Sequence, residues 1–158
     1  MSDFYLFNRI ATTSDREELL KDLYLLEKSL FDVRVPPQKK IKKAFGEKDY
    51  TAFIKLCKER KVETSDPVAV GEFVRELRNG IAAVPSITLS IAFSPTKELE
   101  NVVSKWMGKN LKRKIIINFK VEPGLIAGAT VSYGGIYKDY SINAMVDDYI
   151  KSRGGNIL

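Results

Sequence analysis

Apolar residues in the first half of the chain recur at the spacing of a helix. Leucines between Leu19 and Leu30 follow one another mainly at steps of three and four residues, after a Ser-Asp-Arg-Glu capping box that begins at Ser14. This pattern predicts a helix from residue 14 to about residue 31. Prolines, glycines and further apolar stripes predict three more helices, over residues 36–46, 47–61 and 66–80. The first half is therefore expected to be a helical bundle.

The hydrophobic period changes from 3.6 to 2 near residue 85. Ile87, Leu89 and Ile91 alternate with small polar residues, which predicts a strand with one buried face. A Ser-Pro pair at residues 94–95 is expected to begin a helix that covers the sheet. The apolar stripe of this helix consists of Leu99, Val102, Val103, Trp106 and Met107.

The remaining residues predict a second strand, a hairpin and a last helix. Strands are expected over residues 114–121 and 125–133, followed by a tight turn at Gly134 and a short return strand over residues 136–138. Asp139 is expected to cap the last helix. The side chains of this helix that are expected to face inward are Ile142, Met145, Val146, Tyr149 and Ile150.

These elements place the chain in the α+β class. The predicted organisation is a helical N-terminal domain, residues 1–82, followed by a C-terminal domain, residues 83–158, in which two helices cover a small sheet. A chain of 158 residues is long enough for two small cores of this kind.

The residues around the predicted hairpin form a motif. A Glu-Pro-Gly-Leu-Ile run precedes the third strand, a glycine turn follows it, and Asp-Tyr-Ser-Ile opens the last helix. This pattern, over residues 112–151, resembles the C-terminal domain of the F-type ATP synthase delta subunit, called the oligomycin sensitivity-conferring protein in mitochondria. The order of elements over residues 84–152 is also similar to that family. The positions that match the motif are Glu122, Pro123, Gly124, Leu125, Gly128, Gly134, Asp139 and Ser141.

The resemblance implies a mechanical role that needs no catalysis and no cofactor. Subunits of this family fasten the peripheral stalk, built from b subunits, to the catalytic head, so that rotation is coupled to proton transport and ATP synthesis. The implied partners are the ATP synthase alpha and b subunits, on the cytoplasmic side of a bacterial cell membrane. The N-terminal domain is then a shortened version of the family's six-helix domain. Burial of apolar anchors suits such contacts, and the expected anchors are Val146, Tyr149 and Ile150.

Composition narrows the chemistry further. The chain has no histidine, the side chain best suited to proton transfer near neutral pH and the commonest metal ligand. Its single cysteine, Cys57, lies on the apolar side of a predicted helix and is expected in the core. Glu122, Asp147 and Asp148 lack a clustered arrangement and are expected to be solvated. No catalytic or metal-binding residue is therefore assigned. No apolar run approaches the roughly 18 residues that a membrane span requires.

The positive charge of the chain suggests an alternative function. The net charge is +6, and residues 38–61 contain nine Lys or Arg against three acidic residues. Basic runs with Phe45, Tyr50 and Phe53 nearby are compatible with a basic RNA-binding or adaptor domain, in which cations contact phosphates and rings stack on bases. The competing explanation is that the charges cover a solvated face and the aromatic residues belong to the core.

Overall fold

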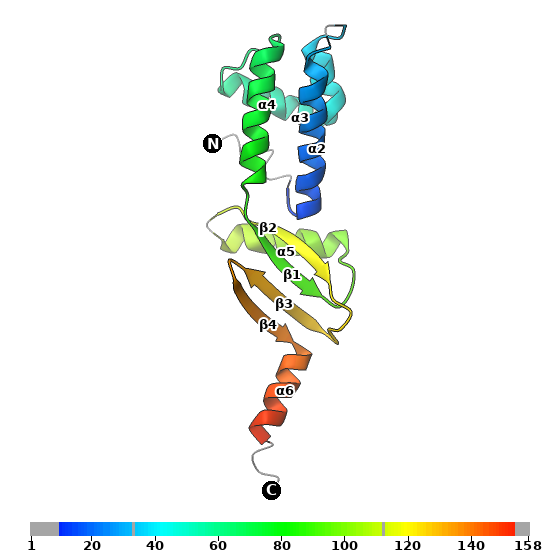
Figure 1. The fold of residues 1–158 in the computed structure, drawn as a ribbon, viewed down its shortest axis with the longest axis vertical. Coiled ribbons are helices and arrows are strands. Elements are labelled where there is room, and N and C mark those ends of the chain that lie inside the picture. Colours follow the sequence, from blue (N-terminus) through cyan, green and yellow to red (C-terminus); the bar gives the residue numbers. More distant parts are fainter. Residues whose placement is uncertain (1–9, 33, 112, 154–158) are drawn as a thin grey trace. The chain divides into compact units, whose positions relative to one another are not determined.

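The computed structural model describes residues 10–32, 34–111 and 113–153 (Figure 1). The chain divides into two compact units, Met1–Val84 and Pro85–Leu158, here called unit 1 and unit 2. The division coincides with the change of hydrophobic period. Unit 1 is helical and unit 2 contains a four-stranded sheet with helices, so the predicted α+β class is confirmed.

Unit 1 is built from α2 (Thr13–Leu30), α3 (Pro37–Glu59) and α4 (Pro67–Ala82), with α2 in contact with both other helices (Figure 1). Its centre contains three aromatic rings. Phe53 stacks on Phe45 at a centroid distance of 4.9 Å and meets Phe73 at 5.8 Å. The buried apolar side chains of unit 1 around them include Leu19, Leu23, Leu26, Leu30, Ile41, Leu56, Cys57, Val70, Val74, Leu77 and Ile81.

Helix α2 begins at Thr13, and its capping residue lies two residues before the predicted one. The capping residue is Thr12 and not Ser14: the Thr12 hydroxyl accepts from the Asp15 N–H at 3.1 Å, and the Asp15 carboxylate accepts from the Thr12 N–H at 2.9 Å. An aspartate therefore fills the position that the sequence analysis gave to Glu17. Phe31, near the predicted end of the helix, follows α2 as its C-terminal cap and is exposed.

The middle of unit 1 contains the predicted break. Gly46 has φ 67° and ψ 179°, which interrupts the helical geometry inside α3, so the two predicted helices 36–46 and 47–61 are confirmed as two helical segments. Helix α4 begins as expected, with the Asp66 carboxylate accepting from the Val68 N–H at 2.8 Å. The predicted end at residues 79–80 is wrong. Ile81 is fully buried, and its burial outweighs the helix-breaking tendency of glycine.

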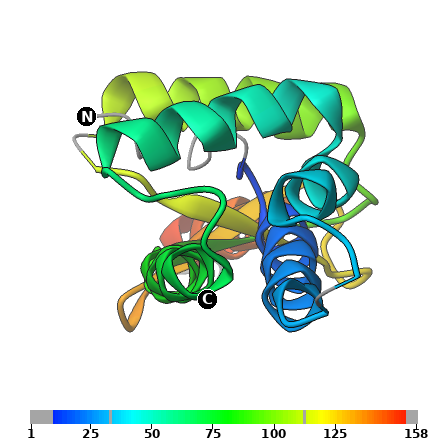
Figure 2. The same ribbon diagram turned by 90° about the horizontal axis from the view of Figure 1, so that it is seen from above.

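Unit 2 contains β1 (Ser86–Ile91), α5 (Lys97–Asn110), β2 (Ile116–Val121), β3 (Gly128–Tyr133), β4 (Ile136–Ser141) and α6 (Ile142–Arg153). The strand order is β2-β1-β3-β4, with β1 and β2 parallel and the other neighbours antiparallel. Helix α5 connects the parallel pair and lies on one side of the sheet (Figures 1 and 2). A crossover helix is the usual connection between parallel strands.

The register gives the sheet one apolar face and one largely polar face. Leu89 pairs with Phe119 of β2 and with Val131 of β3, and Val131 pairs with Lys138 of β4. Paired residues share a face because side chains alternate along a strand. The apolar face therefore consists of Ile87, Leu89, Ile91, Ile117, Phe119, Val121, Ala129, Val131, Tyr133, Ile136, Lys138 and Tyr140.

Two predicted caps in unit 2 are wrong. Helix α5 is capped by Thr96, whose hydroxyl accepts from the Leu99 N–H at 3.3 Å, and not by the Ser-Pro pair. Asp139 lies inside β4, which runs three residues further than predicted. The cap of α6 is Ser141 instead, since its hydroxyl accepts from the N–H of Ala144 at 3.2 Å. In both helices the observed capping residue lies two residues after the predicted one.

Gly128, at the start of β3, pairs with Ser141 at the end of β4. Its φ is +90°, and a Cβ atom there would lie 2.4 Å from the backbone oxygen of Tyr140 and 2.8 Å from the Cα of Ser141. A Cβ atom added at Gly124 would have no other atom within 4 Å. Gly128 is thus explained by the close approach of two backbones, because the space between them leaves no room for a side chain.

We expect Gly128→Ala to destabilise the protein by roughly 2–4 kcal/mol, because it adds both a backbone clash and left-handed strain. Chemical denaturation monitored by circular dichroism measures the difference. Gly124→Ala is the matched control and is expected to stay within about 0.5 kcal/mol of the original protein. Equal effects of the two substitutions would contradict this account of the strand pair.

Candidate binding surfaces

The side chains that could act as a nucleophile or as metal ligands are either buried or far from one another. Cys57 is fully buried, and desolvation raises the pKa of its thiol to about 12, so the nucleophilic thiolate is disfavoured at neutral pH. Among the residues that the structure describes, no three His, Cys, Asp or Glu side chains are grouped to hold a metal ion. Nor does any helix of the described ranges have the length and apolar character to cross a membrane.

The motif residues form the turns that connect the strands of unit 2. The Glu122 N–H donates to the Ile91 oxygen at 2.8 Å, and the Leu125 N–H donates to the Glu122 oxygen at 3.0 Å, which makes a turn that includes Pro123 and Gly124. Gly134, with φ 57°, begins the turn between β3 and β4. Their role in this structure is to shape the backbone.

The remaining motif residues meet where β4 passes into α6. Gly128 pairs with Ser141, and the Asp139 carboxylate accepts from the Ser141 N–H at 2.8 Å. Hydrogen bonding to Ser141 holds the pKa of Asp139 below its usual value, because these donors favour the charged carboxylate. Sequence reasoning placed Asp139 and Ser141 beside each other, but it did not predict that Gly128 joins them across the sheet.

Helix α6 is held at its first turn by the loop that precedes β3. The Ile142 N–H donates to the Ala127 oxygen at 2.9 Å, and the Asn143 side-chain oxygen accepts from the Ile126 N–H at 3.2 Å. No residue separates β4, which ends at Ser141, from α6. The helix therefore leaves the sheet directly from the end of a strand.

The apolar stripe of α6 does not face inward, which corrects the prediction. Val146, Tyr149 and Ile150, the expected partner-binding residues, are 48%, 55% and 59% exposed, and Ile142 and Met145 are exposed as well. These five positions follow the i, i+3, i+4, i+7, i+8 spacing of one helix face. The prediction failed because periodicity identifies an apolar face but does not identify what covers it.

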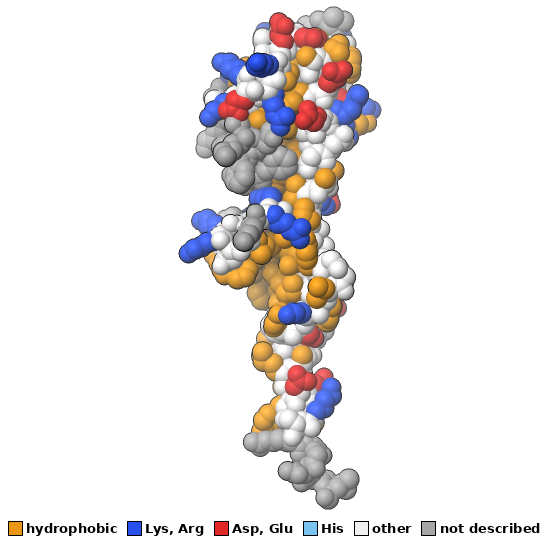
Figure 3. Space-filling model, turned by 90° about the vertical axis from the view of Figure 1, so that its left-hand side faces the viewer, with side chains coloured by type: hydrophobic (Ala, Val, Ile, Leu, Met, Phe, Trp, Pro, Cys, Tyr) orange, Lys and Arg blue, Asp and Glu red, His pale blue; other side chains and the backbone are white. Residues whose placement is uncertain are grey.

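The apolar face of the sheet is open near β4 and at the end of β2. Val121, Ile136 and Tyr140 all lie on this face and are exposed. These three residues and the five stripe residues of α6 are called the open apolar surface below. Figure 3 shows hydrophobic side chains gathered over the sheet of unit 2 and along α6. Large exposed apolar patches mark interaction sites in soluble proteins.

Helix α5 adds a further exposed apolar pair. Trp106 and Val102 are exposed, whereas Met107 is buried, so the prediction that Trp106 packs against the sheet is wrong. The side of α5 that contains Leu99, Val103 and Met107 is the better covered one. The five apolar positions form one broad helix face, and the structure covers only the side of it that contains Leu99, Val103 and Met107.

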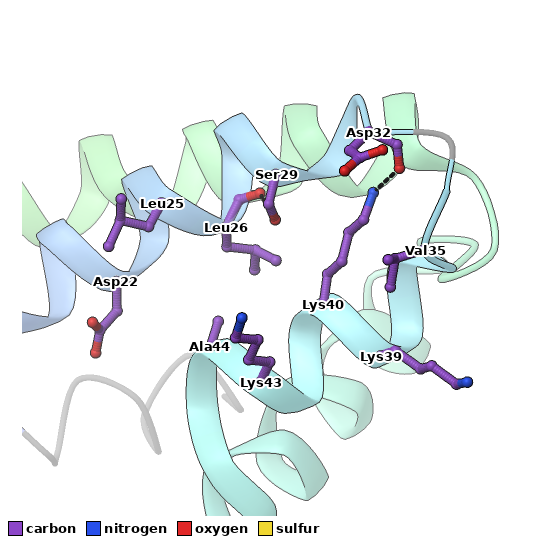
Figure 4. Close-up of a pocket in the computed structure, with 10 residues that line it drawn as sticks. All are labelled: Asp22, Leu25, Leu26, Ser29, Asp32, Val35, Lys39, Lys40, Lys43 and Ala44. Atoms are coloured by element: carbon purple, nitrogen blue, oxygen red, sulfur yellow. Dashed lines mark hydrogen bonds between the residues drawn. The ribbon is translucent and has the colours of Figure 1, made fainter.

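Unit 1 contains a groove between α2 and α3 with a volume of about 500 Å³ (Figure 4). Its apolar wall includes Leu25, Leu26, Val35 and Ala44, and its polar rim includes Asp22, Ser29, Asp32, Lys39 and Lys43. Leu25 and Val35 are both exposed. An apolar wall with charges of both signs at its rim suits a peptide segment better than a small anion, because the carboxylates repel anions.

Lys40 also lines the groove but is used within the fold. Its side chain is 8% exposed, and Nζ donates to the backbone oxygens of Leu30, at 3.2 Å, and of Asp32. The Leu30 carbonyl belongs to the last turn of α2, where acceptors lack intrahelical partners, and Asp32 lies in the segment that follows the helix. A lysine there also complements the negative end of the helix dipole.

Replacing Lys40 by methionine should keep most of the apolar packing and remove the charged donor. We expect Lys40→Met to lower the free energy of unfolding by roughly 1–3 kcal/mol, because buried carbonyls lose a charged hydrogen-bond partner. Thermal denaturation of the two proteins measures this change in stability. Lys39→Met, on the exposed rim of the same groove, is the control and is expected to change stability by less than about 0.5 kcal/mol. A larger loss of stability for Lys39→Met than for Lys40→Met would refute the role of Lys40 as a cap of α2.

An ion-pair network joins α2 to α4. The Glu27 carboxylate lies 3.0 Å from Arg75 Nη2 and 2.5 Å from Arg78 Nη1, and its side chain is 14% exposed. The hydrogen bond from Arg75 and the nearby positive charges hold the pKa of Glu27 below its usual value of 4.5. Sequence analysis did not identify this pair of helices as linked by charge.

This network makes the stability of unit 1 depend on pH. Because the folded-state pKa of Glu27 is lowered, its contribution is present above the unfolded-state value near 4.5 and is lost as pH falls through the folded-state value. We expect Glu27→Gln to destabilise the protein at pH 7 by on the order of 1 kcal/mol, a figure limited by the solvent exposure of Arg75. Denaturation at pH 7 and pH 3 should show the difference shrinking at the lower pH. A difference that stays constant would argue against the ion pairs as its cause.

The basic segment 38–61 does not present the aromatic rings that nucleic-acid stacking requires. Phe45 and Phe53, two of the candidate stacking residues, are buried against each other. Tyr50 is half-buried and lines a small hollow with Lys55 and Lys58. These residues belong to the core of unit 1 or to its edge.

Comparison with known protein families and with curated proteins returns no match for this chain.

Proposed function

We propose that this protein is a non-catalytic stator subunit that links the head of an F-type ATP synthase to its b-subunit stalk. Two lines of reasoning support the proposal. The motif from Glu122 to Ser141 resembles the family's C-terminal signature, and its residues shape the turns and the α6 joint of unit 2. The helical unit followed by an α/β unit also has the order of elements that the resemblance implies.

The observation that carries the proposal is the open apolar surface of unit 2. A subunit whose work is mechanical needs lasting contacts with helices of other chains, and exposed apolar side chains at helical spacing supply anchors for them. Val146 and Ile150 lie on the stripe of α6 and keep about half of their surface in solvent. In the proposed arrangement the stalk's b subunits cover this surface.

The groove of unit 1 is the proposed contact with the alpha subunit. Its wall of Leu25, Leu26 and Val35 offers an apolar seat to an amphipathic segment. Lys39 and Lys43 at the rim favour acidic residues on that segment. The subunit thus has separate surfaces for the head and for the stalk, as a linker requires.

Affinity capture of the tagged protein from gently solubilised membranes of its host tests the proposal. We expect ATP synthase b and alpha subunits to copurify and to remain bound at moderate salt. Val146→Ser combined with Ile150→Ser should reduce recovery of b at least tenfold, because two apolar anchors are lost. The matched control is Asp147→Ser with Lys151→Ser, which alters the same helix outside the stripe, keeps the net charge, and should leave recovery unchanged.

Two results would refute the stator function. One is the absence of b and alpha subunits from the captured material while the protein itself is folded. The other is recovery of RNA or ribosomal proteins that is lost on adding salt, which is the behaviour of phosphate binding by counterion release. That second result would favour the alternative of a basic RNA-binding or adaptor domain.

A further inference from the structure

Unit 2 buries little of its own apolar surface. Its buried apolar side chains are Ile91, Met107, Ile116 and Ile117, whereas unit 1 buries most of its leucine, valine and phenylalanine residues. Many large apolar side chains of unit 2 remain exposed, on α5, on the sheet and on α6. A small domain with an incompletely covered sheet gains stability when another surface covers it.

The direction of α6 prevents the helix from lying on its own sheet without breaking the joint. Folding back would require a loop after Ser141, yet the strand passes into the helix with no intervening residue. It would also break the hydrogen bonds from Ile142 N–H to Ala127 and from Ile126 N–H to Asn143. Short connections of this kind favour exchange between copies over closure within one copy.

Each copy carries both parts of a possible interface. It has a helix whose apolar stripe keeps about half of its surface in solvent, and a sheet face that is open at Val121, Ile136 and Tyr140. A two-fold axis lets the stripe of each copy meet the face of the other, so that every contact occurs twice. A single surface that contains complementary halves is the requirement for such a dimer.

The charges around the two halves are complementary. Asp147 and Asp148 lie on either side of the α6 stripe, given 3.6 residues per turn. Lys138 lies on the apolar face of the sheet between the open positions of β4, and Lys105 and Lys109 follow the exposed Val102 on α5. An acidic-edged helix on a basic-edged face is favoured electrostatically, and the same pairing fixes its orientation.

The area is sufficient for a specific contact. The open apolar surface contains eight partly exposed side chains, and two copies bring sixteen. At roughly 75–125 Å² for each half-exposed aromatic or large aliphatic side chain, complete burial of all sixteen gives about 1,200–2,000 Å², the range of specific interfaces.

We propose that the free protein forms a symmetric dimer in which α6 of each copy lies on the open apolar face of the partner copy's sheet. The inference does not depend on the stator function, since it follows from the two complementary halves of unit 2. If the stalk uses the same surface, the dimer is the unassembled form and dissociates when the b subunits bind.

Sedimentation velocity of the purified full chain over a concentration series tests the dimer. We expect a reversible monomer–dimer equilibrium, with the dissociation constant raised at least tenfold by Val146→Ser with Ile150→Ser. The control Lys151→Ser, on the side of α6 opposite the stripe, should leave the dissociation constant unchanged. A monomer at every concentration, with a folded circular dichroism spectrum, would overturn the proposal.

Cysteine cross-linking then identifies which copy the helix covers. One preparation carries Met145→Cys and another carries Val121→Cys, and Cys57 is buried in both. Mixing them and oxidising should give a mixed disulfide dimer. A chain that carries both substitutions and forms the bond mainly within itself would overturn the proposal, because α6 would then lie on its own sheet. Both experiments use the purified chain alone, so they succeed or fail independently of the capture of stalk subunits.

Discussion

The passage of β4 directly into α6 is the constraint on which the rest of unit 2 depends. Backbone hydrogen bonds at Ile142 and the Ser141 cap fix the first turn of the helix, and the close approach at Gly128 fixes the strand beside it. A helix held in this way continues outward and leaves its apolar stripe in solvent. The exposed sheet face follows from the same cause, since the helix that has an apolar side to cover it points elsewhere.

The direct connection of β4 to α6 explains the positions of the motif residues. Gly128 and Gly134 have positive φ values, and Glu122 and Leu125 form the turn that leads toward Gly128. None of these residues presents a reactive group to a ligand. Their arrangement determines the direction of α6, and the direction of α6 determines which apolar side chains remain exposed. The proposed mechanical function depends on backbone geometry, which is what the motif residues determine.

Local signals in the sequence predicted where helices and strands form better than they predicted which residues these elements contact. The break at Gly46, the Asp66 cap and the change of period at residue 85 could all be predicted, because each depends on neighbouring residues. The cap at Thr12 in place of Ser14 differs because two equivalent cap signals lie two residues apart. The extension of α4 past Gly80 and the extension of β4 over Asp139 came from tertiary burial and strand pairing, which override local preference.

The candidate surfaces were predicted only in part. Periodicity identified Val146, Tyr149 and Ile150 as an apolar face of the last helix and placed them in the interior, whereas the family resemblance made them partner-binding anchors; the structure leaves them exposed. Lys40 lines the groove beside α2, and its long side chain reaches from α3 to the carbonyls of Leu30 and Asp32. No spacing rule within one helix predicts such a contact. Contacts between residues far apart in the sequence determine which apolar residues stay exposed.

Oxidation of methionine by dilute peroxide tests most directly whether unit 2 depends on another chain to cover its apolar surface. Met145 of α6 is 62% exposed and Met107 of α5 is 6% exposed, so the two residues form an internal comparison. In the chain diluted to a monomer, mass spectrometry should show Met145 oxidised much faster than Met107, and Met145 should become protected when another chain binds. Protection of Met145 in the monomer, equal to that of Met107, would contradict the account, because α6 would then cover its own sheet.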